Sequence, residues 1–113
     1  MASRSSHSSA YTRLVTKITK ENLWLYILKM LTDRPMYAYE IGKTLKDAFG
    51  FSTAIVTVYV VLYKMAREGL IHVGEERAGL GRPDRKYYEI TEKGRRDLRD
   101  GIQFLAETVQ KLT

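Results

Sequence analysis

The chain has 113 residues, and none of them is a cysteine. This absence excludes a disulfide framework, a thiolate zinc site, an iron–sulfur cluster and a cysteine nucleophile. No apolar run approaches the about 20 residues that a membrane-spanning helix needs, and the Ser-rich start lacks the apolar segment of a secretory signal. We therefore expect a cytoplasmic protein without membrane contact.

Groups suited to catalysis are also scarce. The only histidines are His7, in the Ser-rich start, and His72, in a predicted strand. Glu75 and Glu76 are adjacent in that strand, so their carboxylates point to opposite faces and suit neither paired acid–base chemistry nor a metal ion. The sequence predicts a protein that is not an enzyme and that uses no metal or cofactor.

Positive charge is concentrated in two segments of a chain of ordinary globular composition, with 44% hydrophobic and 28% charged residues. The formal net charge is +6. Residues 1–20 contain four basic residues and no acidic one, and residues 77–86 contain four basic residues and one acidic one. These two segments hold the whole surplus.

Two helices are predicted between residues 20 and 49. Residues 1–10 show no periodicity and predict a disordered tail, and residues 11–18 favour a short helix. Apolar residues at helical spacing behind a Thr19 N-cap predict a helix over 20–31, which the Pro35 segment ends. The next helix is predicted over 37–49, with Gly50 as its left-handed C-cap residue.

Residues 55–61 are so rich in β-branched side chains that propensity alone favours a strand. Against that, apolar residues keep one helical face, Ser52 or Thr53 can cap the start, and good helix formers lead up to Gly69. We therefore predict a helix over 53–68. Its predicted core face consists of Ile55, Tyr59, Leu62, Met65 and Ala66.

The last third of the chain predicts a hairpin and a long helix. Residues 70–76 and 85–90 alternate in hydrophobicity and predict two antiparallel strands, joined by a Gly- and Pro-containing loop. Thr91 is expected to cap a helix that runs to about residue 112. On this helix a heptad seam predicts a dimer interface. Its members are Leu98, Ile102, Leu105, Val109 and Leu112.

Three helices followed by a basic hairpin predict a mainly α fold, a winged helix-turn-helix over residues 11–90 with a C-terminal dimerisation helix over 91–113. Arg82, Arg85 and Lys86 stand at the tip and exit of the hairpin loop, where they would contact phosphates of double-stranded DNA. The alternative, a solvated loop without a partner, is less favoured beside the helix-turn-helix pattern.

The outward face of the 53–68 helix is the expected reader of base edges. Exposed Val56 and Val60 would contact thymine methyl groups, and hydroxyls near the helix start would reach bases or phosphates. Packing of the two valines against residues 11–18 or a partner chain is an equal alternative. The expected contacts on this face are Ser52, Thr53, Val56, Thr57, Val60, Tyr63, Lys64 and Arg67.

The aromatic side chains Trp24, Tyr37, Tyr39 and Phe49 are candidates to line a pocket for a small-molecule effector between protomers, because aromatic faces bind flat ligands. Core packing is the favoured role of Trp24 and Phe49. The sequence does not identify an effector.

Several motifs together resemble the PadR family of winged-helix transcriptional regulators. The resemblance covers roughly residues 23–98. It rests on the Thr57-Val58-Tyr59, Glu68-Gly69-Leu70-Ile71 and Tyr39-Glu40-Ile41 segments, and above all on Gly81-Arg82-Pro83-Asp84-Arg85-Lys86-Tyr87-Tyr88-Glu89-Ile90-Thr91-Glu92-Lys93-Gly94.

The resemblance implies a homodimeric DNA-binding repressor, with the 53–68 helix as reader, the hairpin as backbone clamp and the last helix as dimer arm. It also implies that Tyr59 lies close to a DNA phosphate, in competition with its predicted place in the core, and adds Tyr39 to the expected DNA contacts. Two other functions remain open at this point, a non-specific architectural DNA-binding protein and a protein–protein adaptor on the same scaffold.

Overall fold

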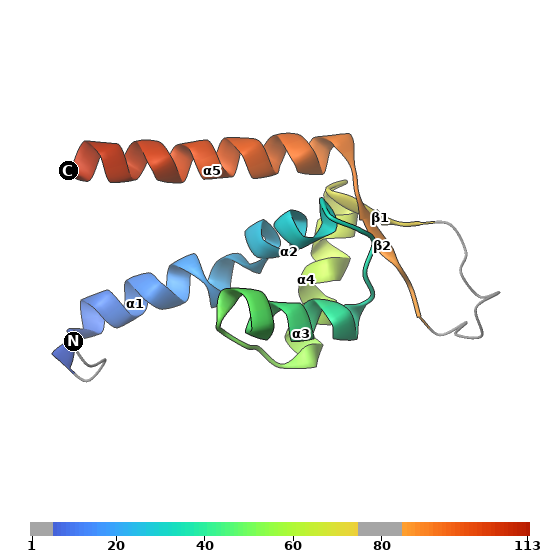
Figure 1. Ribbon diagram of the computed structural model, residues 1–113, viewed down its shortest axis with the longest axis horizontal. Coiled ribbons are helices and arrows are strands. Elements are labelled where there is room, and N and C mark those ends of the chain that lie inside the picture. The colour runs from blue at the N-terminus through green and yellow to red at the C-terminus, as the bar shows by residue number, and fades with distance from the viewer. Residues whose placement is uncertain (1–5, 75–84) are drawn as a thin grey trace.

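The computed structural model describes residues 6–74 and 85–113. Figure 1 shows a helical body with a two-stranded sheet at one end and the long last helix along one side. The elements are α1 (Ser9–Ile18), the 3-10 turn η2 (Lys20–Asn22), α2 (Leu23–Leu31), α3 (Ala38–Phe49), α4 (Ile55–Arg67), β1 (Ile71–Val73), β2 (Tyr88–Ile90) and α5 (Glu92–Leu112).

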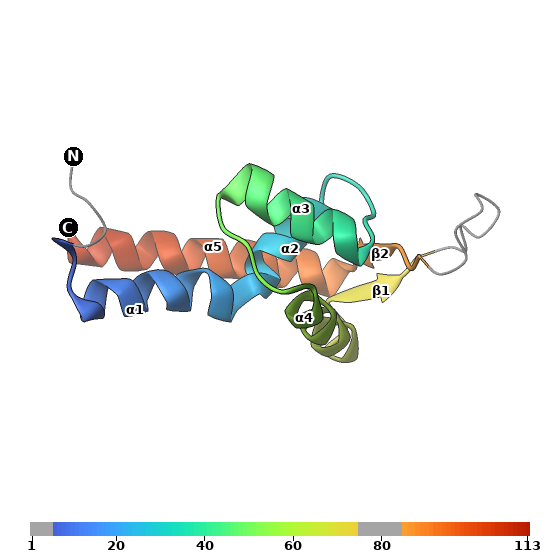
Figure 2. The ribbon, with the colours of Figure 1, turned by 90° about the horizontal axis from the view of Figure 1, so that it is seen from below.

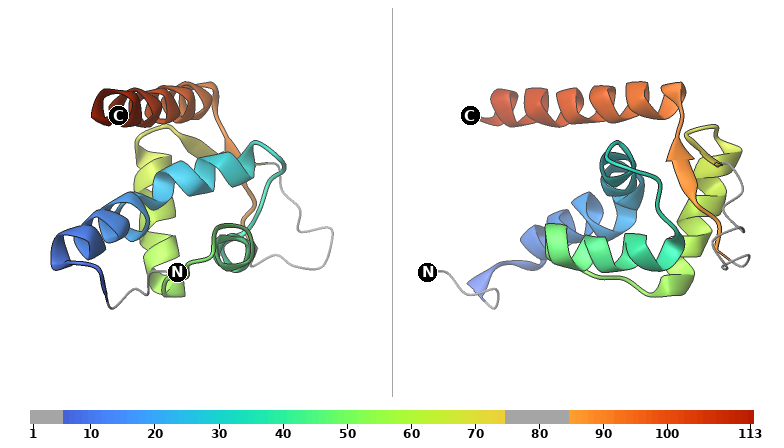
Figure 3. Two further views of the ribbon diagram at one scale, coloured as in Figure 1. Left: turned by 60° about the vertical axis from the view of Figure 1, so that its left-hand side comes forward. Right: turned by 45° about the vertical axis from the view of Figure 1, so that its right-hand side comes forward.

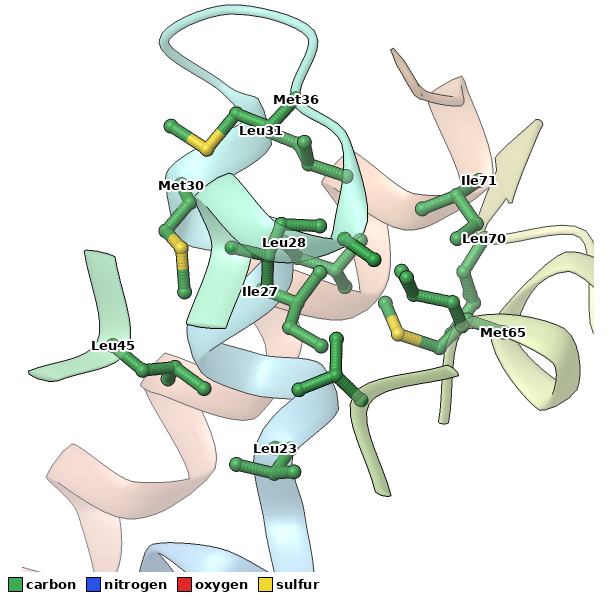
Figure 4. Close-up of a cluster of buried hydrophobic side chains, with 14 of the residues drawn as sticks. Leu23, Ile27, Leu28, Met30, Leu31, Met36, Leu45, Met65, Leu70 and Ile71 are labelled. Atoms are coloured by element: carbon green, nitrogen blue, oxygen red, sulfur yellow. The ribbon is translucent and has the colours of Figure 1, made fainter. Parts of the chain in front are cut away.

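Helix α2 lies at the centre of the core. Its apolar side chains Leu23, Ile27 and Leu28 are almost fully buried, and α3, α4, α5 and β2 all pack against it. Figure 4 shows these side chains in the cluster that also contains Leu45 of α3 and Met65 of α4. Burial of this contiguous apolar cluster supplies the main stabilisation of the fold.

Helices α3 and α4 form the predicted helix-turn-helix. Gly50 ends α3 in the left-handed conformation with φ 79°, as predicted, and Gly69 follows α4 with φ 80°. The β-branched run of α4 is helical because Val58, Leu62 and Met65 recur at spacings of four and three and bury against the core. Tertiary packing therefore overrides the strand propensity of the segment.

The rotation of α4 differs from the prediction. Val58 is fully buried where Tyr59 was expected, Tyr59 is 47% exposed, and Ala66 is also exposed. The N-cap residue is Ala54, with no side-chain cap, so neither Ser52 nor Thr53 caps the helix.

The two strands form an antiparallel hairpin in which Ile71 pairs with Ile90, His72 with Glu89, and Val73 with Tyr88. Both strands are shorter than predicted. An isolated bridge between Met36 and Tyr88 ties the segment before α3 to the base of this wing. The loop tip, with Arg82, lies outside the described residues.

The start of the chain is more ordered than predicted. Ser9 and Ala10 belong to α1, because the Ser8 side chain accepts a hydrogen bond from the Tyr11 N–H and caps the helix. Thr19 does not cap the next helix. Its hydroxyl donates to the Val15 carbonyl at 2.6 Å and thus ends α1.

Helix α5 begins as predicted, since the Thr91 hydroxyl accepts a hydrogen bond from the Gly94 N–H at 3.0 Å. Gly94 lies directly against the Leu70 carbonyl, and a Cβ there would also stand 2.9 Å from Ile90 Cγ1. Because the carbonyl is backbone and cannot rotate away, only glycine allows α5 to approach the sheet this closely.

We expect Gly94→Ala to lower the free energy of unfolding by about 2–3 kcal/mol, because overpacking in a fixed core costs this much. The matched control is Gly42→Ala in the interior of α3, where an added Cβ meets nothing within 4 Å. That change should leave stability equal or raise it by up to about 1 kcal/mol. Urea unfolding monitored by circular dichroism measures both, and equal stabilities would contradict the close-approach argument.

Candidate nucleic-acid interface

Helix α4 presents one face that no described part of the chain covers. Val56, Val60, Tyr63 and Arg67 follow at spacings of four, three and four and therefore share this face. Val56 is 67% and Val60 48% exposed, so residues 11–18 of the same chain bury neither valine. The Arg67 guanidinium lies 5.8 Å from the centre of the Tyr63 ring, a cation–π distance. The face is thus apolar and aromatic, with a cation at its end.

A groove of about 350 Å³ flanks this face between the start of α3, α4 and the base of the wing. Figure 3 shows these three elements converging at one end of the body. Its lining residues are Tyr37, Ala38, Tyr39, Tyr59, Arg85, Lys86 and Tyr88. Four phenol groups and two permanent cations therefore face one opening.

Ring contacts fix the tyrosines of the groove. Tyr39 and Tyr59 stand edge to face, with ring centres 6.5 Å apart, and Tyr37 meets Tyr87 in the same way at 5.4 Å. The Arg85 guanidinium carbon lies 4.3 Å from the centre of the Tyr37 ring. This cation–π contact holds the charge of Arg85 at the mouth of the groove rather than free in solvent.

Tyr88 is a half-buried phenol of the groove. Its burial, and secondly the nearby Tyr59 phenol, raise the pKa of Tyr88 above the ordinary tyrosine value. The group is therefore neutral at physiological pH and available as a hydroxyl donor. A neutral donor beside two cations suits an anionic oxygen such as a phosphate.

The structure brings together four of the expected DNA contacts, Tyr39, Tyr59, Arg85 and Lys86, in this groove. Ser52 is exposed at the turn before α4, and Thr53 and Thr57 are half-buried beside it. Lys64 is not part of the groove. It lines a second depression, between α2, α4 and α5, together with Trp24 and Asp97.

Sequence reasoning missed Tyr88 and gave Tyr37 a different role. The backbone bridge between Tyr88 and Met36 joins segments 52 residues apart, and it places Tyr88 beside Tyr37 at the groove. The pair Tyr87-Tyr88 directly after Lys86 was the sequence feature that could have indicated the place of Tyr88 in the groove. The aromatic set suggested for an effector does not line one cavity within the protomer, because Trp24 lies in the second depression and Phe49 packs edge-on against Tyr26.

The predicted seam of α5 is divided into two parts. Leu98 is only 8% exposed and belongs to the core of its own protomer, so it is not free for a partner. Farther along the helix, Leu105 is half-buried, and Ile102, Val109 and Leu112 are exposed, the last at 81%. The overhanging half of α5 therefore carries the uncovered apolar stripe.

A second uncovered stripe, which the sequence analysis did not identify, lies on α1. Tyr11, Leu14, Val15 and Ile18 recur at spacings of three, one and three and are all exposed. Figures 1 and 2 show α1 and α5 extending to the same side of the body. The two helices thus present apolar stripes in the same region.

Neither a metal site nor a membrane span is found in residues 6–74 and 85–113. No three His, Asp or Glu side chains in this part of the chain are grouped to hold a metal ion. No helix there is long and apolar enough to cross a bilayer.

Comparison with solved structures shows the same architecture in transcriptional regulators. A PadR-like transcriptional regulator from Bacillus cereus is 33% identical, with 82% of this chain and 92% of that chain covered and a TM-score of 0.66. A PadR family transcriptional regulator from Eggerthella lenta is 28% identical, with 93% and 96% covered and a TM-score of 0.65. A search of curated proteins finds no match.

The family model described as "Transcriptional regulator PadR-like family" matches residues 27–100, from the interior of α2 to the first half of α5. The match includes the helix-turn-helix, the wing and the groove between them. The sequence resemblance is therefore confirmed, and the chain belongs to the PadR-like family of transcriptional regulators.

Proposed function

We propose that the protein is a sequence-specific repressor that binds double-stranded DNA as a homodimer, with α4 in the major groove and the wing on the flanking backbone. The observation that carries this proposal is the uncovered face of α4, which is apolar and aromatic and lies directly beside a cationic, phenol-lined groove. Such a pair of surfaces matches the two parts of a DNA duplex, its base edges and its phosphates.

The composition of the α4 face favours base reading over purely electrostatic binding. Val56 and Val60 can contact thymine methyl groups, and Ser52 at the preceding turn supplies a hydroxyl for a base edge or phosphate. A protein that binds only the backbone needs cations at these positions, because phosphate contacts dominate non-specific affinity. Among Val56, Val60, Tyr63 and Arg67 only Arg67 is charged, and the exposed Lys64 beside them lines the depression between α2, α4 and α5.

The groove between α3, α4 and the wing suits a backbone phosphate. Arg85 and Lys86 supply permanent charge, and the hydroxyls of Tyr39, Tyr59 and Tyr88 supply neutral donors. These contacts would fix the register of α4 on the duplex without reading sequence. Arg82, in the loop outside the described residues, remains an expected additional contact.

A homodimer accounts for the stripes on α1 and on the distal half of α5. In a two-fold dimer the apolar stripe of α1 in one protomer can pack on the apolar stripe of α5 in its partner. Leu14 and Val109 would then both be removed from solvent. Exposed apolar surface of this extent on two helices that extend to the same side of the body (Figure 1) is otherwise unfavourable. The dimer would present two copies of α4 to a pseudo-palindromic site and block that site to the transcription machinery.

Selection of bound fragments from a random DNA pool tests sequence specificity. We expect enrichment of two inverted half-sites whose centres lie about 34–36 Å apart, one helical turn. The alternative function, architectural binding without sequence preference, would instead enrich no motif and give unphased protection in a footprint. That result would contradict the repressor proposal.

Reversal of charge at the groove tests the phosphate contacts. We expect the double change Arg85→Glu and Lys86→Glu to weaken DNA binding at least about tenfold and to reduce the salt slope by roughly two per bound protomer. The control is the double change Arg96→Glu and Arg99→Glu, which alters two exposed cations of α5 by the same total charge. Equal losses in both variants, measured by fluorescence anisotropy over a salt series, would show that only net charge matters.

Polar substitution in the apolar stripes tests the dimer. Leu14→Asp in α1 and Val109→Asp in α5 should each give monomers, because a buried unpaired carboxylate is strongly unfavourable. Both should also weaken binding to a paired site much more than to a single half-site. Gln103→Asp, exposed on another side of α5, is the control. Sedimentation velocity that shows dimers in all three variants would remove these stripes from the interface.

A further inference from the structure

On either side of Leu98, which is buried in the core, α5 approaches its own protomer closely at two further points. The first is its start, where the Thr91 hydroxyl donates to the Gly69 carbonyl at 2.6 Å, the Lys93 ammonium donates to the Glu68 carbonyl at 2.8 Å, and Gly94 lies against the Leu70 carbonyl. These contacts attach the helix to the end of α4. They leave its angle to be set elsewhere.

The second point is Gly101, two helical turns farther along. A Cβ at this position would stand 3.2 Å from the Trp24 ring carbon Cη2 and 3.1 Å from Leu25 Cδ1 of α2. Both distances are shorter than ordinary van der Waals contact, so a larger side chain requires the neighbours or α5 to move by a few tenths of an ångström. Glycine at position 101 therefore permits a close approach of α5 to α2.

The indole of Trp24 is itself fixed. Its Nε1–H donates to Asn22 Oδ1 at 3.1 Å, and the Asn22 amide donates in turn to the Lys17 carbonyl at the end of α1. The same indole lines the depression that Val61 and Lys64 of α4 share. One side chain thus links α5 to the end of α1 through Asn22, and it lines the same depression as two residues of α4.

Beyond Gly101 the apolar residues Ile102, Val109 and Leu112 are exposed and Leu105 is half-buried, so the close approach at Gly101 is followed by a half of the helix that is largely uncovered. The distance along the helix from Gly94 is about 10 Å to Gly101 and about 27 Å to Leu112. A displacement of about 0.5 Å at Gly101 therefore becomes about 1 Å or more at the helix end. In a two-fold dimer both arms move, and the separation of the two α4 helices changes with them.

We propose that the Trp24–Gly101 contact is a positioning device that sets the separation of the two reader helices and thereby the half-site spacing that the dimer accepts. The inference rests on the proposed function, because it requires a dimer built on α1 and α5. It assigns a specificity role to two residues that lie outside the DNA-contacting surface.

The absence of cysteine allows a direct distance measurement. A single Ala66→Cys change in α4, at an exposed position, accepts one spin label per protomer. In this background Gly101→Ala should shift the label-to-label distance in the dimer by roughly 1–2 Å, and Gly101→Leu should shift it further in the same direction. Gly42→Ala, with open space around the added Cβ, should leave the distance unchanged.

DNA binding supplies the functional readout. In Gly101→Ala the ratio of affinities for paired and single half-sites should fall at least about threefold at the wild-type spacing. Random-pool selection with Gly101→Leu should enrich a different spacing of the same half-site. Adding Trp24→Phe to Gly101→Ala removes the ring atoms that the new methyl group meets but leaves Leu25 Cδ1 in place, so it should restore part of the distance and part of the affinity ratio.

The outcomes separate the two proposals. If Gly101→Ala kept the label-to-label distance and the affinity ratio of the wild-type protein, the positioning role would be overturned. This holds even if Gly101→Leu failed to fold. A loss that Trp24→Phe does not restore would overturn the role of the indole. Failure of the proposed function is recognised in the wild-type protein itself, as a monomer in sedimentation or as binding without preference for paired half-sites, and it would remove this inference as well.

Discussion

The burial of Val58, Leu62 and Met65 of α4 in the core that α2, α3 and β1 share with it is the constraint on which the rest of the molecule depends. Burial of these three side chains fixes the rotation of α4 about its axis. That rotation turns Val56 and Val60 to solvent and leaves Tyr59 at the edge, against Tyr39 and the wing. The exposed face of α4 is therefore a consequence of the core, because a helix has one rotation and its buried side determines its exposed side.

Much of the fold could be predicted from the sequence because its signals are local. The caps at Thr91 and Gly50 and the apolar periodicity of α3 and α5 act over a few residues. The rotation of α4 could not be predicted in the same way. Residues 55–62 are apolar except Thr57, so several rotations bury apolar side chains equally well, and the choice of Val58 over Tyr59 depends on the shape of the surfaces that α2 and α3 present.

The sequence predicted only part of the site, because some of its features are local and others depend on contacts between distant segments. The location of the surplus charge identified Arg85 and Lys86 before any contact was known. The groove they share with Tyr37 and Tyr88 depends on the Met36–Tyr88 bridge, which joins segments far apart in sequence. The seam of α5 was continuous in sequence but is interrupted in space, since Leu98 is used by the core. Periodicity shows that a stripe is apolar and does not show which element covers it.

The first half of α5 is packed on the body and the second half is largely exposed, and this difference follows from the glycines of the helix. Gly94 and Gly101 are seven residues apart and flank Leu98 on the face toward the core, so the first half of the helix approaches the sheet and α2 closely. A continuous α5 with larger residues at these positions would stand farther from the body and would bury Leu98 less. Close packing of the first half holds the second half in one direction. In the proposed dimer, a rigid second half would hold the two DNA-binding units at a defined distance. A flexible one would let each unit bind alone.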